Sequence, residues 1–279
     1  MKSESKGIFA LVISAFLWST GGIFIKLVDW NGFAISGTRS LIASLVLLAY
    51  LRKPKFSFSF PQLSAAFASA CTMTLYVLAN KLTTAANTIL LQYTAPIYVA
   101  ILAWIILKEK PSLNNWIALA IISLGMTLFF AGKLSTGNMT GNILAILSGV
   151  GLAFFTVFMR MQKGNSPYES YLLAHFITFI ASIPFIFKAG LPEASGWLGI
   201  LMLGIFQTGF TSLSFSYGIK QVPALKAMLI LTLEPILNPI WVFLFAGEVP
   251  GINAIIGGIF IIGAVLFTTI YSAKREKAT

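Results

Sequence analysis

Three ionisable residues lie inside long apolar segments of the chain, and they are the residues best placed to do chemistry: Arg39, His175 and Glu234. Ionisable side chains are costly in a bilayer, and by default they indicate a functional site. Glu234 lies near the middle of its segment, in the stretch LTLEPILNP, and shares a helix face with Asn238. This carboxylate could bind a proton, a cationic substrate, or both in competition. The structural alternative is a hydrogen bond to a neighbouring helix.

Two prolines accompany Glu234 in this stretch, Pro235 and Pro239. A proline in a helix has no backbone N–H to donate, so it frees the carbonyl one turn earlier. Pro235 therefore frees the carbonyl of Leu231. A free carbonyl is tolerated in a membrane where it lines a cavity or is satisfied by a neighbour. The stretch predicts a kinked helix beside a cavity or a polar partner.

The other two ionisable residues each have two interpretations. His175 belongs to a polar stripe at helical spacing with Tyr171, Thr178 and Ser182. It could relay protons, because the charge of a histidine changes near neutral pH, or it could form a hydrogen bond across helices. Arg39 could bind a substrate carboxylate through two parallel hydrogen bonds. Alternatively, it could snorkel towards the interface or fix an outer gate.

Aromatic and amide residues near these charges would complete a binding site, because ligand cavities combine apolar walls with a few polar groups. For the aromatic residues, packing inside the bundle is an equally good explanation. The residues that we predict to bind substrate are Trp18, Tyr76, Tyr93, His175, Gln207, Glu234 and Asn238, with Arg39 as a gating or charge residue. No catalytic residue, metal site or cofactor is predicted.

The composition of the chain places these residues in a membrane protein. Of its 279 residues, 57% are hydrophobic and 10% are charged, whereas a soluble domain has about 25% charged residues. The mean hydropathy is +0.88. Apolar segments of about 20 residues, the length that spans a bilayer as a helix, recur along the chain. The sequence therefore predicts an all-α integral membrane protein.

The same composition excludes several function classes. The net charge of +11 does not indicate nucleic-acid binding, because the basic residues are scattered through short loops. A single cysteine, Cys71, gives no disulfide framework or cysteine metal site. No G-x-x-x-x-G-K-S/T phosphate loop is present, so the chain does not itself use ATP. An enzyme is not predicted either, because the single histidine has no acidic pair near it in the sequence.

We expect ten membrane spans, joined by short connections. With the N-terminus in the cytoplasm, 14 of the 19 lysines and arginines lie on the cytoplasmic side, four lie outside and Arg39 lies within a span. This positive-inside bias places both termini in the cytoplasm, and the lack of a transit-type leader favours a bacterial inner membrane. The N-terminal segment is expected to remain as the first helix. The predicted spans cover residues 8–27, 34–51, 62–79, 85–107, 112–131, 141–160, 169–187, 197–218, 224–245 and 252–272.

The two halves of the chain resemble each other. In TAPIYVAILAWIILKEKP and LEPILNPIWVFLFAGEVP, Pro96 aligns with Pro235 and Glu109 aligns with Glu248. Further upstream, GIFALVISAFLWSTGGIFIK matches GNILAILSGVGLAFFTVFMR. Because each half has five spans, the second half must insert upside down. Inverted repeats of this kind are typical of secondary transporters, with the substrate site between the repeats near the membrane midplane.

This doubled motif, followed by a glycine-rich final helix, resembles the two EamA domains of the drug/metabolite transporter superfamily. The resemblance covers nearly the whole chain, and it implies a first EamA repeat at residues 1–133 and a second at residues 140–274. It also implies a central cavity lined by the first four helices of each half, and transport of small metabolites. The fifth and tenth helices would lie at the periphery, often in dimer contacts. Ala95 stands where the second half has Glu234, and only part of the family has an acid there, so the resemblance does not give the substrate.

The sequence therefore predicts a secondary transporter of small polar metabolites that works by alternating access, with export of amino acids or related metabolites favoured. Its partners would be the substrate, protons through Glu234, the lipid bilayer and a second copy of the chain in a homodimer; no nucleic acid is expected. A transporter of organic cations, either amines or quaternary ammonium compounds, is the alternative, because a carboxylate with aromatic faces suits a cation. A further alternative is a non-transporting membrane receptor, which would bind solute without moving it.

Overall fold

The computed structural model describes residues 2–83, 85–131, 138–237, 241 and 251–278. Every regular element in these ranges is a helix, so the prediction of an all-α protein is confirmed for the described part of the chain. Six helical runs there are long and apolar enough to cross a membrane, and two shorter apolar helices cover Leu113–Phe129 and Ile252–Thr268. The total of ten spans and their inverted repeat stay predictions.

The helices follow the apolar segments of the sequence, and each overlaps one of the predicted spans. Before residue 132 the elements are α1 (Lys2–Ser19), α2 (Gly21–Lys26), α3 (Gly32–Leu51), α4 (Phe60–Leu82), α5 (Ala85–Gln92), α6 (Ala95–Leu102), the π-helical η1 (Ala103–Leu107) and α7 (Leu113–Phe129). After residue 137 they are α8 (Met139–Met161), α9 (Pro167–Ala189), α10 (Ala194–Met202), the π-helical η2 (Leu203–Phe210), α11 (Thr211–Gln221), α12 (Ala224–Leu231) and α14 (Ile252–Ala278). A further short helical stretch covers residues 233–237.

Polar residues and prolines begin several of these helices. The side-chain oxygens of Asn31 and Asn138 accept hydrogen bonds from the backbone N–H groups of Ala34 (2.9 Å) and Gly141 (3.3 Å). Each cap satisfies a backbone donor that has no partner within its own helix. Prolines occupy the first turn of α4 and of α9, where the missing N–H would have had no partner.

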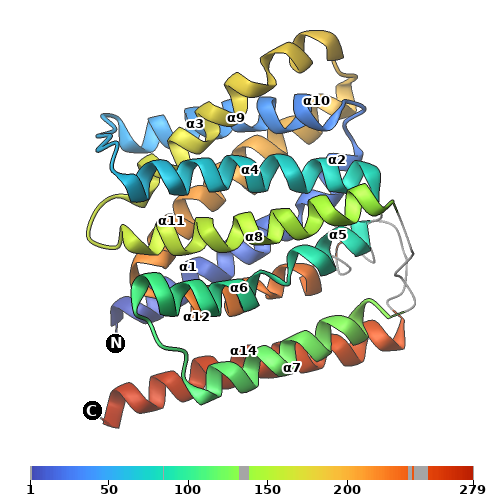
Figure 1. The fold of residues 1–279 in the computed structure, drawn as a ribbon. Coiled ribbons are helices and arrows are strands. Elements are labelled where there is room, and N and C mark those ends of the chain that lie inside the picture. Colours follow the sequence, from blue (N-terminus) through green and yellow to red (C-terminus); the bar gives the residue numbers. More distant parts are fainter. Residues whose placement is uncertain (1, 84, 132–137, 238–240, 242–250, 279) are drawn as a thin grey trace.

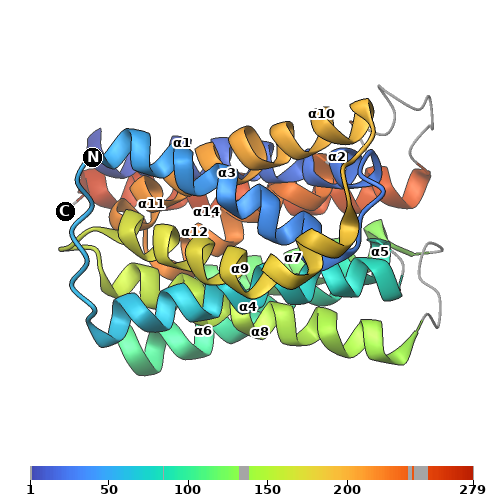
Figure 2. The same ribbon diagram turned by 90° about the horizontal axis from the view of Figure 1, so that it is seen from above.

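The helices lie side by side along one long axis, as Figures 1 and 2 show. The most extensive helix–helix contacts are those of α4 with α8, α3 with α9, α7 with α14, and α1 with α11. Each of these pairs joins a helix before residue 132 to a helix after residue 137. The bundle core is therefore built between the two halves of the chain rather than within either half.

The α7–α14 pair lies along one side of the bundle in Figure 1. Its two backbones approach closely at a glycine crossing, because a Cβ atom added to Gly257 would lie 2.5 Å from the carbonyl oxygen of Gly125. Small residues commonly allow such an approach between membrane helices. Gly257 of the last helix is thus explained by packing against α7.

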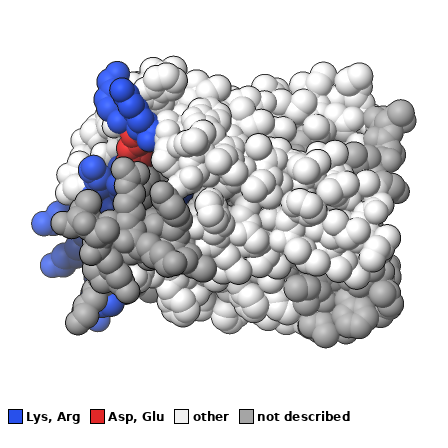
Figure 3. Space-filling view, turned by 90° about the horizontal axis from the view of Figure 1, so that it is seen from below, with Lys and Arg blue, Asp and Glu red and all other residues white. Residues whose placement is uncertain are grey.

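Basic side chains gather at one end of the molecule. On the face shown in Figure 3, the lysines and arginines lie at the end where both chain termini lie in Figure 1, and most of the remaining described surface is uncharged. Many large apolar side chains, such as Phe9, Leu45 and Ile180, are exposed along the bundle. An apolar flank with charges at its end is the surface expected of a helical bundle in a bilayer.

Candidate functional site

Two interrupted helices meet in the interior of the bundle. The helical run from α5 to α6 is broken at Tyr93 and Thr94, and the run that begins with α12 is broken at Thr232. A proline follows each break, Pro96 in the first and Pro235 in the second, and each removes the N–H that would bond one turn back. The breaks fall at matching places in the repeated motif. Helices α6 and α12 contact each other.

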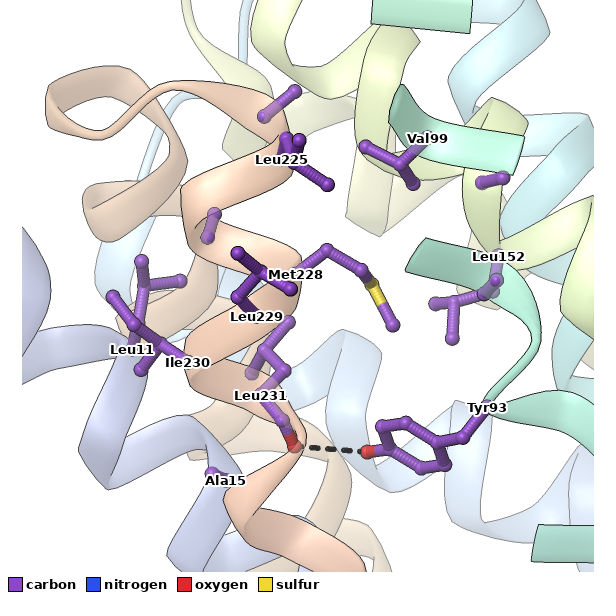
Figure 4. Packing of buried hydrophobic residues seen from close by; sticks show 14 of the residues in the cluster. Leu11, Ala15, Tyr93, Val99, Leu152, Leu225, Met228, Leu229, Ile230 and Leu231 are labelled. Carbon is purple, nitrogen blue, oxygen red and sulfur yellow. Dashed lines mark hydrogen bonds between the residues drawn. The ribbon is translucent and has the colours of Figure 1, made fainter. Parts of the chain in front are cut away.

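Tyr93 connects the two breaks. Its hydroxyl donates to Oε2 of Glu234 at 2.5 Å and lies 3.0 Å from the carbonyl oxygen of Leu231. Figure 4 shows the Tyr93 ring reaching from its own helix to the end of α12, with its hydroxyl directed at that carbonyl. Leu231 is the residue whose carbonyl Pro235 leaves without a helical partner. A side chain of the other interrupted helix therefore provides the missing donor.

Arg39 lies inside the bundle without an acidic partner among the described residues. Only 4% of its surface is exposed, and its Nη1 atom donates to Oε1 of Gln207 at 3.4 Å. Its Nε atom is buried and has no hydrogen-bond partner in the described part of the chain. Tyr76 lies within electrostatic range of both Arg39 and Glu234. Tyr76 is thus the side chain that lies within electrostatic range of both predicted charges of opposite sign.

His175 is fully buried between α9 and α11. Its Nε2 atom lies 2.9 Å from Oγ of Ser212, and its ring stacks on Tyr171 with ring centroids 5.6 Å apart. Tyr171, Thr178 and Ser182 are buried as well, so the polar stripe of α9 faces the protein interior. His175 lies within electrostatic range of Arg39. This geometry matches the interpretation of His175 as a residue bonded across helices, and in this conformation no part of its surface is open to a ligand.

Trp18 lies at the edge of an aromatic cluster. Its ring centroid is 5.7 Å from that of Phe215, and Phe215 in turn contacts Phe155 and Tyr171 at 5.2 and 5.8 Å. Phe215 is fully buried, whereas Trp18 is half-buried. The cluster joins α1 to α8, α11 and α9, the helix that carries His175.

The predicted residues divide by accessibility. Arg39, Tyr93 and His175 are buried in this conformation. Asn238, which was predicted to share the face of Glu234, lies outside the described residues. The residues that keep part of their surface accessible, and could therefore touch a ligand in this conformation, are Trp18, Tyr76, Gln207 and Glu234.

Two polar contacts of the site had no counterpart in the sequence patterns. Ser212, the partner of His175, is not among the residues that the sequence predicted for the site. Trp241 donates its indole N–H to Oγ of Ser19 at 2.8 Å and packs against Phe16. Both contacts depend on how distant segments pack, and residue spacing along one helix carries no such information.

Gln207 lies in the π-helical element η2. Short π-helical stretches are rare and are often found at functional sites. Gly21 packs directly against this side chain, because a Cβ atom added there would lie 3.0 Å from Nε2 of Gln207. The break between α1 and α2 is thereby brought next to the amide that also accepts from Arg39.

Comparisons with known proteins agree with this architecture. The EamA-like transporter family matches residues 5–131 and again residues 139–270. A protein of Archaeoglobus fulgidus named "Uncharacterized transporter" is 26% identical over 259 residues, which are 92% of this chain and 94% of the relative. The mouse protein "Solute carrier family 35 member G1" is 28% identical over 208 residues, 67% of this chain and 53% of the relative. A crystal structure with 18% sequence identity has a TM-score of 0.82 and covers 98% of this chain and 99% of that chain, which shows a shared fold.

Proposed function

Because the chain belongs to the EamA-like transporter family, we propose that it is a secondary transporter that exports amino acids or related zwitterionic metabolites. The family and these relatives are transporters, not enzymes. In this proposal, residues 1–133 and 140–274 form two inverted five-helix repeats in the inner membrane, with both termini in the cytoplasm. Alternating access between the repeats exposes the same site to each side in turn.

One observation carries the choice of substrate class: Arg39 and Glu234 lie inside the bundle with Tyr76 within electrostatic range of both, and each has only neutral hydrogen-bond partners among the described residues. Glu234 accepts from the Tyr93 hydroxyl, and Arg39 donates to the Gln207 amide. An ionised group in a membrane interior is stabilised by an opposite charge. A zwitterion supplies both, its ammonium group to Glu234 and its carboxylate to Arg39.

The remaining residues of the site have distinct roles in this proposal. Tyr93 fixes the orientation of the Glu234 carboxylate, and Gln207 holds the guanidinium of Arg39. Tyr76 and Trp18 offer aromatic surface to the body of the substrate. The Nε atom of Arg39 is buried in this conformation and has no hydrogen-bond partner among the described residues; once the site opens, it donates to one oxygen of the substrate carboxylate, in the parallel geometry that guanidinium groups favour. Protons compete with the substrate ammonium at Glu234 and thereby couple transport to the proton gradient.

A transporter of organic cations is the second candidate, and the contact between Glu234 and Tyr93 favours it. A carboxylate beside aromatic faces suits amines and quaternary ammonium groups, and Tyr76 and Trp18 would add to the aromatic wall. Such a substrate has no carboxylate for Arg39 to bind. The two candidates therefore differ in whether Arg39 takes part in recognition.

Ligand-dependent thermal stability of the purified protein tests the proposal. A ligand at 100 times its Kd stabilises the folded state by about 2.7 kcal/mol, which raises Tm by roughly 5–10 °C in a protein of this size. Neutral amino acids are expected to stabilise the protein, and choline is not. Stabilisation by choline but not by amino acids would support a transporter of organic cations instead.

The variant E234Q tests whether Glu234 acts in ligand binding and transport rather than in folding. We expect it to fold, to lose the amino-acid effect on Tm, and to lose transport into proteoliposomes or its pH dependence. E193Q is the matched control, because Glu193 is exposed at the start of α10, away from the site. Full transport by E234Q with an unchanged pH profile would refute the role of Glu234. Ligand binding without any flux in the wild-type protein would indicate a receptor.

A further inference from the structure

Arg160 joins three elements at the end of the bundle where the chain termini lie. It is 9% exposed, and its Nε atom donates to Oε1 of Glu109 at 2.8 Å. Its Nη1 atom donates to the carbonyl oxygens of Lys220 at 2.7 Å and Ile219 at 3.1 Å. These carbonyls belong to the last turn of α11, where the helix dipole favours a positive charge.

Glu109 extends this contact to α12. Its second carboxylate oxygen accepts from the backbone N–H of Ala224, the first residue of α12, at 3.0 Å. A helix N-terminus favours a negative charge because its first N–H groups have no helical partner. Glu109 thus lies between the guanidinium of Arg160 and the start of α12, and it is bonded to both.

A second ion pair holds the same end of α12. Nζ of Lys226 donates to Oε1 of Glu4 at 2.7 Å. Lys226 lies in α12 and is 6% exposed, and Glu4 lies in the first turn of α1. In both pairs the acid comes from before residue 133 and the base from after residue 140. Both pairs therefore connect the two halves of the chain.

The opposite end of α12 carries the site. Leu231, its last residue, provides the carbonyl that Tyr93 contacts, and Glu234 follows three residues later. The helix between them has eight residues, so it is about 12 Å long at 1.5 Å per residue. A rigid element of this length transmits a displacement of its first turn to the site.

We propose that the pairs Glu109–Arg160 and Glu4–Lys226 form the cytoplasmic gate of the transporter, with Glu109 as the residue that positions α12 in the closed state. The inference rests on the proposed function, since a gate requires alternating access. In the closed state both pairs tie α12 to the other half of the chain. When the site opens to the cytoplasm, both pairs break and the first turn of α12 moves away from Glu109.

A buried reporter on α12 tests the gate without any substrate. Met228 is fully buried within α12, between Lys226 and the site. In the background C71A, which removes the only native cysteine, the variant M228C places one thiol behind the proposed gate. A charged, membrane-impermeant thiosulfonate reagent is applied to inside-out vesicles to probe the cytoplasmic face, and to right-side-out vesicles to probe the other face. E109Q is expected to raise the population of the open state by about tenfold or more. The labelling rate from the cytoplasmic face then rises by the same factor, because only the open state exposes the thiol.

Three outcomes overturn the proposal. They are an unchanged labelling rate in E109Q, an equal rise from both faces, and a rise from the outer face alone. E193Q is the matched control at a distant acid and is expected to label like the parent. E4Q repeats the test on the second pair, so the result does not depend on whether E109Q folds.

Charge exchange distinguishes an ion-pair gate from simple packing. The double variant E4K/K226E restores the second pair with reversed sign, and we expect it to label about as slowly as the parent protein. E109R/R160E is expected to stay fast, because each exchanged charge would face a helix end of the same sign. Fast labelling in E4K/K226E would overturn the role of its ion pair. If E109Q speeds the labelling of M228C but the protein transports none of the tested solutes, the proposed gate is supported and the proposed substrate class is wrong.

Discussion

Removing the hydroxyl of Tyr93 gives the sharpest test of the interrupted-helix site. The variant Y93F keeps the ring, which is 7% exposed in the core of the bundle, and deletes only the atom that contacts Glu234 and Leu231. The Leu231 carbonyl and the Glu234 carboxylate then lose the single hydrogen that this hydroxyl offers to one or the other of them, and Pro235 prevents the backbone from replacing it at Leu231. Glu234 has no other hydrogen-bond donor among the described residues.

The size of the effect follows from these two acceptors. Leaving a buried acceptor unsatisfied costs about 1–3 kcal/mol, and measured hydrogen bonds between membrane helices average about 0.6 kcal/mol with a maximum near 1.7. We therefore expect Y93F to lower the free energy of unfolding by about 1–2 kcal/mol. At roughly 2–4 °C per kcal/mol, the apparent Tm falls by about 2–8 °C.

The assay is thermal unfolding of the purified variant in detergent, with and without the stabilising ligand. Y98F is the matched control, because Tyr98 lies in α6, five residues after Tyr93, is half-buried, and its hydroxyl has no hydrogen bond within the described ranges. We expect Y98F to unfold like the parent protein, and Y93F to lose both stability and part of its ligand effect. If Y93F and Y98F had the same Tm, the hydroxyl bridge would not hold the two breaks together.

Three further variants address other parts of the site. R39Q should fold and lose at least about tenfold in affinity for zwitterionic ligands, or 1.4 kcal/mol, when binding is measured by titration calorimetry; unchanged affinity would remove Arg39 from recognition. S212A deprives His175 of its partner and should cost about 1–3 kcal/mol in thermal unfolding, whereas S216A, one turn on, deletes a buried hydroxyl without a described partner and should be neutral or stabilising. G149A should fail to fold or lose more than about 2 kcal/mol by overpacking, because its Cβ would lie 2.7 Å from a backbone carbonyl oxygen; a normal yield and Tm would contradict the close approach at the α5–α6 break.

The helical architecture could be predicted from local properties of the chain. A mean hydropathy of +0.88 and apolar runs of bilayer length leave little choice but membrane helices. Asparagine caps and first-turn prolines also place helix starts within a few residues. Breaks inside a helical run are harder to predict from the sequence. Pro96 and Pro235 indicate two of them, whereas the break between α1 and α2 at Thr20 has no proline.

The site could be predicted only as a set of candidates. The rule that a proline frees the carbonyl one turn back identified Leu231 as an acceptor in need of a partner. It did not identify Tyr93 as the donor, because that contact spans 138 residues and depends on how two helices pack. For His175 the sequence left a proton relay and a cross-helix bond equally open, and the contact with Ser212 now favours the bond. Asn238 lies outside the described residues, so its place on the face of Glu234 stays a prediction.

The bridge at Tyr93 has a chemical consequence, because a phenol carries one hydrogen and here faces two acceptors. When Glu234 is ionised, the charge-assisted bond is the stronger one, and the carbonyl of Leu231 receives no proton. When Glu234 is protonated, its own O–H can donate to the phenol oxygen, and the hydrogen of Tyr93 becomes available to Leu231. The ionisation of one side chain and the backbone pairing at a helix break are then thermodynamically linked. The binding of a proton to Glu234, or the displacement of that proton by a cation, therefore changes the hydrogen bonding of the Leu231 carbonyl.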